Sequence, residues 1–239
     1  MKLAARIAMG VLAVVAVAAV GFGALYTSRI QTANSIEKLT DYDDYNLYRM
    51  QVRYDYDLDK KIANTTADNQ SFIDAAVKQA LPLLPVSIKA PTFGCSAFHI
   101  QETGGDHLMG RNYDFKRDTS AMLVCTAPKD GYKSFAALDN LGVNQADAST
   151  KAKIASLLAP FACLDGINEK GVSIAVLTLD SEPTKQDTGK PVLATTMAIR
   201  LVLDRAATRP WSCCSSTICL LPAAATTTFT SPMPPVTAA

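Results

Sequence analysis

The sequence predicts an α+β fold in which strands and helices pack in layers, with one apolar helix ahead of them. Three observations predict this class. Short apolar or alternating runs, typical of strands, cluster between residues 94 and 139. Another apolar, β-branched run follows at 172–177, and helical spacing returns at 192–207. Strands followed by a helix that covers them are typical of layered α+β domains.

The first expected element is a helix through residues 7–26, an uncharged apolar run that follows Lys2 and Arg6. About 20 apolar residues span a bilayer, and basic residues ahead of the run keep its start in the cytoplasm. A signal peptide has the same order of parts, and Ala-Val-Ala at 16–18 could serve a signal peptidase. We expect residues 1–28 to be a membrane anchor or a signal peptide. The rest of the chain is then extracytoplasmic, either membrane-anchored or secreted after signal cleavage.

Residues 29–94 are expected to form a linker and a possible propeptide. The first half is polar and rich in tyrosine and aspartate, whereas residues 70–81 have the spacing of a short amphipathic helix. Pro82 and Pro85 end that helix. An ordinary N-terminal extension is the alternative to a propeptide.

Two runs, at 94–100 and 110–115, are expected to pair as a hairpin. Thr-Gly-Gly-Asp at 103–106 supplies glycines suited to a tight turn. A turn centred there pairs position 95 with about position 113. Strands are then expected at 121–125 and 134–138.

Cys95, Arg111 and Asp114 are the candidate catalytic residues on this hairpin. A cysteine is a strong nucleophile once ionised, an Arg beside it favours the thiolate, and an Asp orients a cation or amine. A cut between Gly94 and Cys95 would create an α-amine with a pKa of about 7.7–8, which could take the thiol proton without any histidine. A strict period of two places Arg111 and Asp114 on opposite faces, so Gly110 or a bulge must re-aim one of them if both serve one site. A half-buried structural cysteine beside a surface ion pair is the alternative.

Four motifs in order carry a resemblance to a known family. They are Gly-Cys-Ser at 94–96 with Gly-Arg-Asn-Tyr-Asp-Phe at 110–115, Leu-Asp-Gly-Ile-Asn-Glu-Lys-Gly-Val at 164–172, Gln-Asp-Thr-Gly-Lys-Pro at 186–191 and Ala-Ile-Arg-Leu-Val-Leu-Asp at 198–204. From about residue 92 to Thr208 the chain resembles the linear amide C–N hydrolases, in the choloylglycine hydrolase and acid-ceramidase-like branch of the N-terminal-nucleophile (Ntn) hydrolases. The resemblance implies an αββα sandwich, of which residues 95–208 would be the N-terminal part.

The resemblance also implies roles for individual residues. Cys95 would be the nucleophile, with Arg111 and Asp114 as its partners, and removal of residues up to Gly94 would be autocatalytic. Thr178 falls where some members carry an Asn that stabilises the oxyanion, so it is a possible oxyanion or substrate contact. The substrate would be a small-molecule acyl amide.

Other residues are given structural roles. Asn168 and Glu169 are expected to form a turn, with Asp165 capping or pinning it. Three of the six cysteines lie in residues 209–239. Of the others, Cys125 and Cys163 have apolar surroundings and are expected in the core.

No metal, cofactor or nucleic acid is expected. The two histidines, His99 and His107, lack the spacing of a zinc site, and His99 lies too far along its strand from Cys95 for a Cys-His pair. No phosphate-binding glycine motif occurs. The net charge of +1 gives no reason to expect a nucleic-acid partner. The oligomeric state stays open.

Residues 209–239 form an aberrant C-terminal segment. From Pro210 onward it has no charged residue, and it follows abruptly on a well-patterned helix. A low-complexity tail is one explanation. The other is translation out of frame, because codons read two nucleotides later permit a string that resembles the family's continuation. Our hypothesis is a frameshifted, truncated fragment of a longer hydrolase.

The sequence therefore predicts hydrolysis of a non-peptide linear amide through an N-terminal cysteine acyl-enzyme, with this chain itself impaired. An acyltransferase that uses the same acyl-enzyme is one alternative. An inactive, membrane-tethered fragment is the other.

Overall fold

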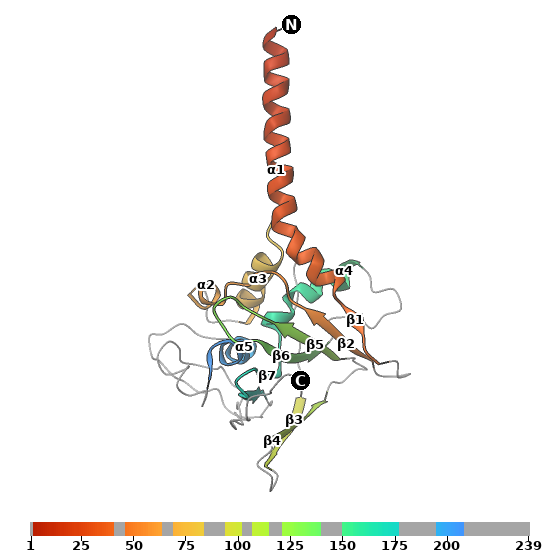
Figure 1. Ribbon diagram of the computed structural model, residues 1–239, viewed down its shortest axis with the longest axis vertical. Coiled ribbons are helices and arrows are strands. Elements are labelled where there is room, and N and C mark those ends of the chain that lie inside the picture. The colour runs from red at the N-terminus through yellow and green to blue at the C-terminus, as the bar shows by residue number, and fades with distance from the viewer. Residues whose placement is uncertain are drawn as a thin grey trace.

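The computed structural model describes the backbone of residues 2–40, 46–63, 69–83, 94–101, 107–114, 121–139, 150–176 and 195–207. The expectations about Thr178 and about the segment 209–239 concern residues outside these ranges. Figure 1 shows one long helix that stands out from a mixed body of strands and shorter helices.

The described helices are α1 (Lys2–Asn34), α2 (Leu58–Ala63), α3 (Asn69–Ala80), α4 (Thr150–Ala155), the 3-10 helix η1 (Ser156–Phe161) and α5 (Thr195–Arg205). The described strands are β1 (Glu37–Lys38), β2 (Leu47–Gln51), β3 (Gly94–Gln101), β4 (His107–Asp114), β5 (Ala121–Thr126), β6 (Ser134–Asp139), β7 (Asp165–Asn168) and β8 (Ser173–Ala175). The predicted α+β class is confirmed.

Six of the described strands form one sheet in the order β1-β2-β5-β6-β7-β8, and β3 pairs with β4 in a separate two-stranded sheet. β2 runs parallel to β5. The other neighbours in the larger sheet are antiparallel. The strands predicted at 121–125 and 134–138 are β5 and β6. Nearly all of β5 is buried, as expected of an apolar strand that is covered on both faces.

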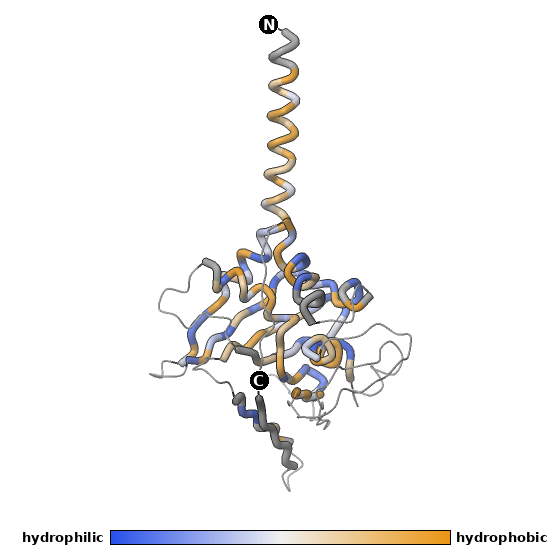
Figure 2. Tube along the Cα trace, turned by 180° about the vertical axis from the view of Figure 1, so that it is seen from behind, coloured by the Kyte–Doolittle hydropathy of each residue, from blue (hydrophilic) through white to orange (hydrophobic). Residues whose placement is uncertain are grey.

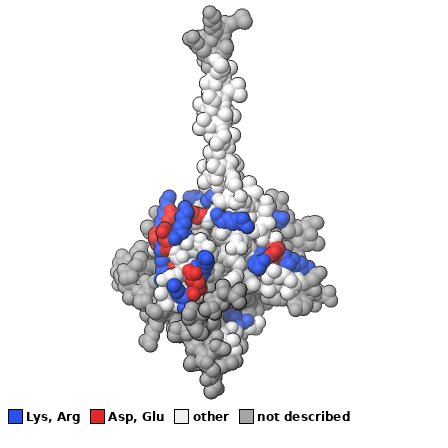
Figure 3. Space-filling model, in the orientation of Figure 1, with Lys and Arg blue, Asp and Glu red and all other residues white. Residues whose placement is uncertain are grey.

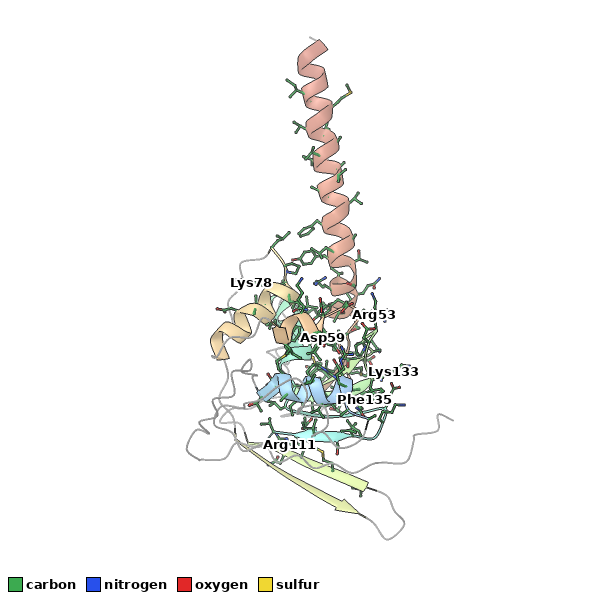
Figure 4. All side chains as sticks on the ribbon, turned by 90° about the vertical axis from the view of Figure 1, so that its left-hand side faces the viewer. Arg53, Asp59, Lys78, Arg111, Lys133 and Phe135 are labelled. Carbon is green, nitrogen blue, oxygen red and sulfur yellow. The ribbon has the colours of Figure 1, made fainter. Side chains whose placement is uncertain are left out.

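The elements stack in layers. In Figures 1 and 4 the helices, including α5, lie over one face of the larger sheet, and the β3–β4 hairpin lies beyond the other face. The core between helices and sheet contains Met50, Met122, Val124, Ala136, Ile174, Ile199, Val202 and Leu203. Apolar side chains at alternate strand positions and at helical spacing therefore build the interior, and the hairpin adds a second β layer.

The described parts of the segment expected to be a linker and possible propeptide belong to the folded body. β2 adds a strand to the sheet beside β5, and the helix predicted at 70–81 is α3. A second apolar cluster joins this segment to the later part of the chain. It contains Tyr54, Tyr56, Leu58, Ile62, Ala76, Val77, Ala80 and Leu81 from one side, and Leu157, Leu158, Phe161, Met197, Ala198 and Leu201 from the other.

Helix α1 continues past the boundary expected at residue 28 and ends at Asn34 inside the body. Arg29, in the second-last turn of α1, is buried. The guanidinium donates from Nε to the carbonyl of Ala80 at 2.7 Å and from Nη2 to that of Gln79 at 2.9 Å. Carbonyls at a helix C-terminus lack helical partners and attract cations. Arg29 therefore caps α3, which explains why a charged residue does not end α1.

Replacement of Gly166 tests the packing of α5 on the sheet. A Cβ there would lie 2.5 Å from the carbonyl oxygen of Phe135 and 2.7 Å from Cδ1 of Leu203. Gly166→Ala should therefore lower the free energy of unfolding by about 1–3 kcal/mol, the usual cost of overpacking. Chemical denaturation in detergent measures this. Gly10→Ala is the control, because a Cβ added at Gly10 meets nothing within 4 Å, and equal stability of the two variants would contradict the close approach.

Candidate active site

Cys95 is the second residue of β3, and the hairpin has a regular antiparallel register. Cys95 pairs with Tyr113, and Ala97 pairs with Arg111. The predicted pairing of position 95 with about position 113 is therefore confirmed. In such a ladder, positions 95 and 111 are diagonal neighbours on one face, typically about 7–8 Å apart, a distance that a long side chain covers.

Asp114 pairs with Gly94, so its position lies directly across the hairpin from the expected cleavage point. The ladder is continuous from 94–101 to 107–114, and these two described strands contain no bulge. Gly110 keeps the regular register. Because faces alternate along a strand, the structure brings the positions of Cys95 and Arg111 to one face of the hairpin and that of Asp114 to the other.

Arg111 extends from β4 toward the larger sheet (Figure 4). There it forms an ion pair with Asp165 on β7. Its Nε donates to Oδ2 of Asp165 at 3.2 Å, and the two side chains are only 8% and 10% exposed. The other carboxylate oxygen of Asp165 accepts the backbone N–H of Ala137 at 3.3 Å. Asp165 therefore connects three strands, β4, β6 and β7, rather than only pinning the turn that follows it.

This ion pair supplies the electrostatics of the site. A buried charge is costly unless it is paired, so Asp165 stabilises a guanidinium on the face of the hairpin that holds position 95. A nearby cation lowers the pKa of a cysteine thiol. From the sequence, Arg111 was identified as a site residue, but Asp165 was not identified as its partner. The Asp in the Leu-Asp-Gly motif was the signal that could have indicated a role beyond the turn.

The other described cysteines do not suit nucleophilic chemistry. Cys125 and Cys163 are free and buried, and Cys163 donates from Sγ to the carbonyl of Ala159 at 3.1 Å. Burial raises the pKa of Cys163 to about 12 and raises the pKa of Cys125 above its ordinary value. Because a thiol must ionise to attack, both are structural residues, as the sequence predicted.

Asn168 is a turn former, as predicted, and it also caps a helix. Its Oδ1 accepts the backbone N–H groups of Lys170 and Val172 at 3.0 and 3.1 Å. Its Nδ2 donates to the carbonyls of Leu203 and Ala206 at 3.0 and 2.7 Å. The side chain thus fixes the β7–β8 turn against the C-terminal end of α5. This structural role fully accounts for the asparagine of the second motif.

The last motif forms a buried polar network that the sequence analysis did not foresee. On α5, Nε of Arg200 donates to Oδ1 of Asp204 at 2.9 Å, and the same guanidinium donates to Oγ of Ser134. Oδ2 of Asp204 accepts the hydroxyl of Tyr56 at 2.8 Å. Burial raises the pKa of Tyr56 well above its ordinary value, so this hydroxyl stays protonated as a donor. The sequence signal for this network was an Arg and an Asp four residues apart on an otherwise apolar helix.

A polar pocket of about 260 Å³ lies beside this network, and the described residues that line it include Tyr56, Asp204 and Arg205. Two of its carboxylates face cations: Asp59 accepts from Arg205 at 2.8 Å, and Asp55 lies 3.7 Å from Lys129. Over the described part of the chain, no group of three or more His, Cys, Asp or Glu residues could hold a metal ion.

The layered α+β body, with a strand that has a cysteine at its start, is consistent with part of an Ntn-hydrolase fold. Residues 95–209 match the model of the linear amide C–N hydrolases, choloylglycine hydrolase family. The resemblance found in the motifs is therefore confirmed over these residues. The match begins at Cys95 itself. No curated protein and no solved structure matches the chain.

Loss of the charge on Asp165 tests the buried pair. Asp165→Asn removes one charge of a largely buried ion pair, so the free energy of unfolding should fall by about 3–5 kcal/mol. Chemical denaturation measures the change. The control is Asp59→Asn, because Asp59 is exposed in its pair with Arg205 and such pairs contribute about 0–1 kcal/mol. A similar cost for the two variants would contradict the role of the buried pair.

Proposed function

We propose that the hydrolase domain represented by residues 95–209 cleaves a linear amide C–N bond, with the thiol of Cys95 as the nucleophile; whether this chain retains that activity is what the turnover assay below measures. The family match that begins at Cys95 carries the proposal. The register of the hairpin supports it, because position 95 is a diagonal neighbour of Arg111. The substrate is a small molecule that contains an acyl group joined to an amine.

The reaction begins with cleavage between Gly94 and Cys95, which gives the cysteine a free α-amine. With a pKa of about 7.7–8, this amine accepts the thiol proton near neutral pH. The thiolate attacks the amide carbonyl, a C–S bond forms and the C–N bond breaks, and the α-amine returns the proton to the leaving amine. Water then hydrolyses the thioester, which releases the acid and restores the thiol.

The neighbouring residues have distinct roles in this proposal. The guanidinium of Arg111 stabilises the thiolate, and Asp165 positions that guanidinium. The position of Asp114 lies opposite Gly94 in the ladder. A carboxylate there would orient the α-amine that cleavage creates. Thr178 would donate its hydroxyl to the oxyanion of the tetrahedral intermediate.

Cleavage would leave the N-terminal segment attached to the body. β2 pairs with β5 over residues 47–51, and the second apolar cluster joins residues on both sides of Gly94. The hydroxyl of Tyr56 also donates to buried Asp204. We therefore infer that the processed enzyme consists of two non-covalently associated chains rather than one chain and a released propeptide.

Helix α1 is proposed to anchor the enzyme in a membrane. Residues 7–34 form a helix long and apolar enough to span a bilayer, and the span is exposed in the fold, although a signal sequence has the same properties. Figure 2 shows the apolar residues along this helix, and Figure 3 shows no charged side chain on its exposed stretch. Lys2 and Arg6 favour a cytoplasmic start, so the body would lie outside the cytoplasm.

Substitution of the nucleophile tests the reaction. Cys95→Ala should abolish both processing and turnover of a panel of acyl amides, because no other described thiol ionises readily. Intact-mass spectrometry reports whether a chain that begins at Cys95 is formed. Cys125→Ala, which removes a buried structural thiol, should keep turnover within a few-fold of the unmodified protein. Turnover that survives Cys95→Ala would exclude Cys95 as the nucleophile.

Association of the cleaved chains is a separate prediction. After processing, the segment that ends at Gly94 should co-elute with the chain that begins at Cys95 in detergent-containing size-exclusion chromatography, and should separate only in denaturant. Tyr56→Phe removes the hydrogen bond to Asp204 and should lower the denaturant concentration at which they separate. Release of the segment without denaturant would show that it is a dissociable propeptide.

A further inference from the structure

The apolar part of α1 meets the folded body at Tyr26. Residues 7–25 are exposed, whereas Tyr26 is buried. Over residues 7–26, a helical rise of about 1.5 Å per residue gives a length of about 30 Å. The hydrocarbon core of a bilayer has the same thickness, about 30 Å. If α1 spans the bilayer, no residues remain to separate the bilayer from the body. The edge of the hydrocarbon core then falls where the body begins.

The turn after α3 is held at this level. The hydroxyl of Tyr26 donates to the carbonyl of Pro82. The ring of Tyr26 stacks on that of Phe22, with centroids 4.5 Å apart, and the guanidinium of Arg29 lies 5.9 Å from its centroid. Tyrosine gathers at the boundary between membrane and water. This contact sets the turn beside the aromatic residues that mark the boundary.

Leu83, the next residue of that turn, has two unusual properties. Its side chain is 83% exposed, although Leu81 just before it is buried. Its φ angle is 71°, in the left-handed region that is unfavourable for a leucine. Strained backbone of this kind is retained where the surroundings or a function require it. The strained turn presents an apolar side chain to whatever lies beside α1.

The charge nearby suits a lipid surface. Lys78 is exposed in the last turn of α3, and Figure 4 shows it on the side of the body from which α1 emerges. An ammonium group at this level is suited to phosphate headgroups.

We propose that the turn at residues 81–83 is a second contact with the bilayer that α1 spans, in which Leu83 inserts among the acyl chains at the boundary. The inference rests on the anchoring role proposed for α1, and it is independent of the amide chemistry. The β3–β4 hairpin lies at the end of the body opposite α1 (Figure 1). Two-point attachment therefore holds position 95 away from the bilayer, so the enzyme takes a substrate supplied from the aqueous phase.

Fluorescence quenching by lipid tests the contact in the full-length chain. Trp211 is the one tryptophan of the sequence, so Trp211→Phe gives a background protein without tryptophan fluorescence. Leu83→Trp on that background is reconstituted into phosphatidylcholine–phosphatidylglycerol vesicles whose acyl chains carry bromine near the headgroup. Its emission should shift to the blue and fall at least twofold. The control is Phe135→Trp, because Phe135 is 55% exposed on β6 and Figure 4 shows it lower in the body than Lys78, away from the exposed stretch of α1; its emission should not change.

Each outcome decides the inference. Vesicles that float with the protein and quench Leu83→Trp but not Phe135→Trp support the second contact. Flotation without quenching of Leu83→Trp overturns the contact and leaves α1 as the only anchor. Equal quenching of both variants overturns the proposed orientation. Failure to float overturns the anchoring by α1 together with the contact, and none of these results bears on hydrolysis.

Discussion

The buried ion pair between Arg111 and Asp165 joins the hairpin to the larger sheet, and the candidate active site depends on it. A guanidinium with only 8% of its side chain exposed is costly without a carboxylate, and Asp165 is itself fixed by the backbone N–H of Ala137. The position of β4, and through the ladder that of Cys95, is therefore coupled to β6 and β7. One pair both places the hairpin and keeps a positive charge on the face that holds position 95.

A similar arrangement joins the helices to the N-terminal segment. Arg200 on α5 contacts Asp204 and Ser134, and Asp204 in turn accepts from Tyr56. Both networks use a long basic side chain to connect elements far apart in sequence, and in both the carboxylate has a second donor. Because Tyr56 precedes the proposed cleavage point and Asp204 follows it, the same polar core that orders α5 would also keep the two processed chains together.

The elements predicted from sequence are those whose signals are local. The hairpin pairing follows from its turn, and α3 from helical spacing, whereas the family follows from short motifs in order. The Arg111–Asp165 pair could not be predicted, since its members lie 54 residues apart and meet only when two layers stack. The strand β2 was not predicted, because the tyrosines and aspartates on both sides of it make the mean hydropathy of that segment polar. Arg29 was expected outside α1, because sequence alone does not show that the end of α3 accepts its charge.

These contacts form a continuous path from α1 to the hairpin. Arg29 caps α3, the second apolar cluster packs α3 and η1 against α5, and Asn168 fixes the end of α5 to the turn after β7. Asp165, at the start of β7, then holds Arg111 on the hairpin. The steps are buried or largely buried, so the distance from the anchor to position 95 is set by the packed body rather than by a flexible linker. With α1 in a bilayer, as proposed, that fixed distance would keep position 95 out of the lipid, and the substrate would then come from the aqueous phase.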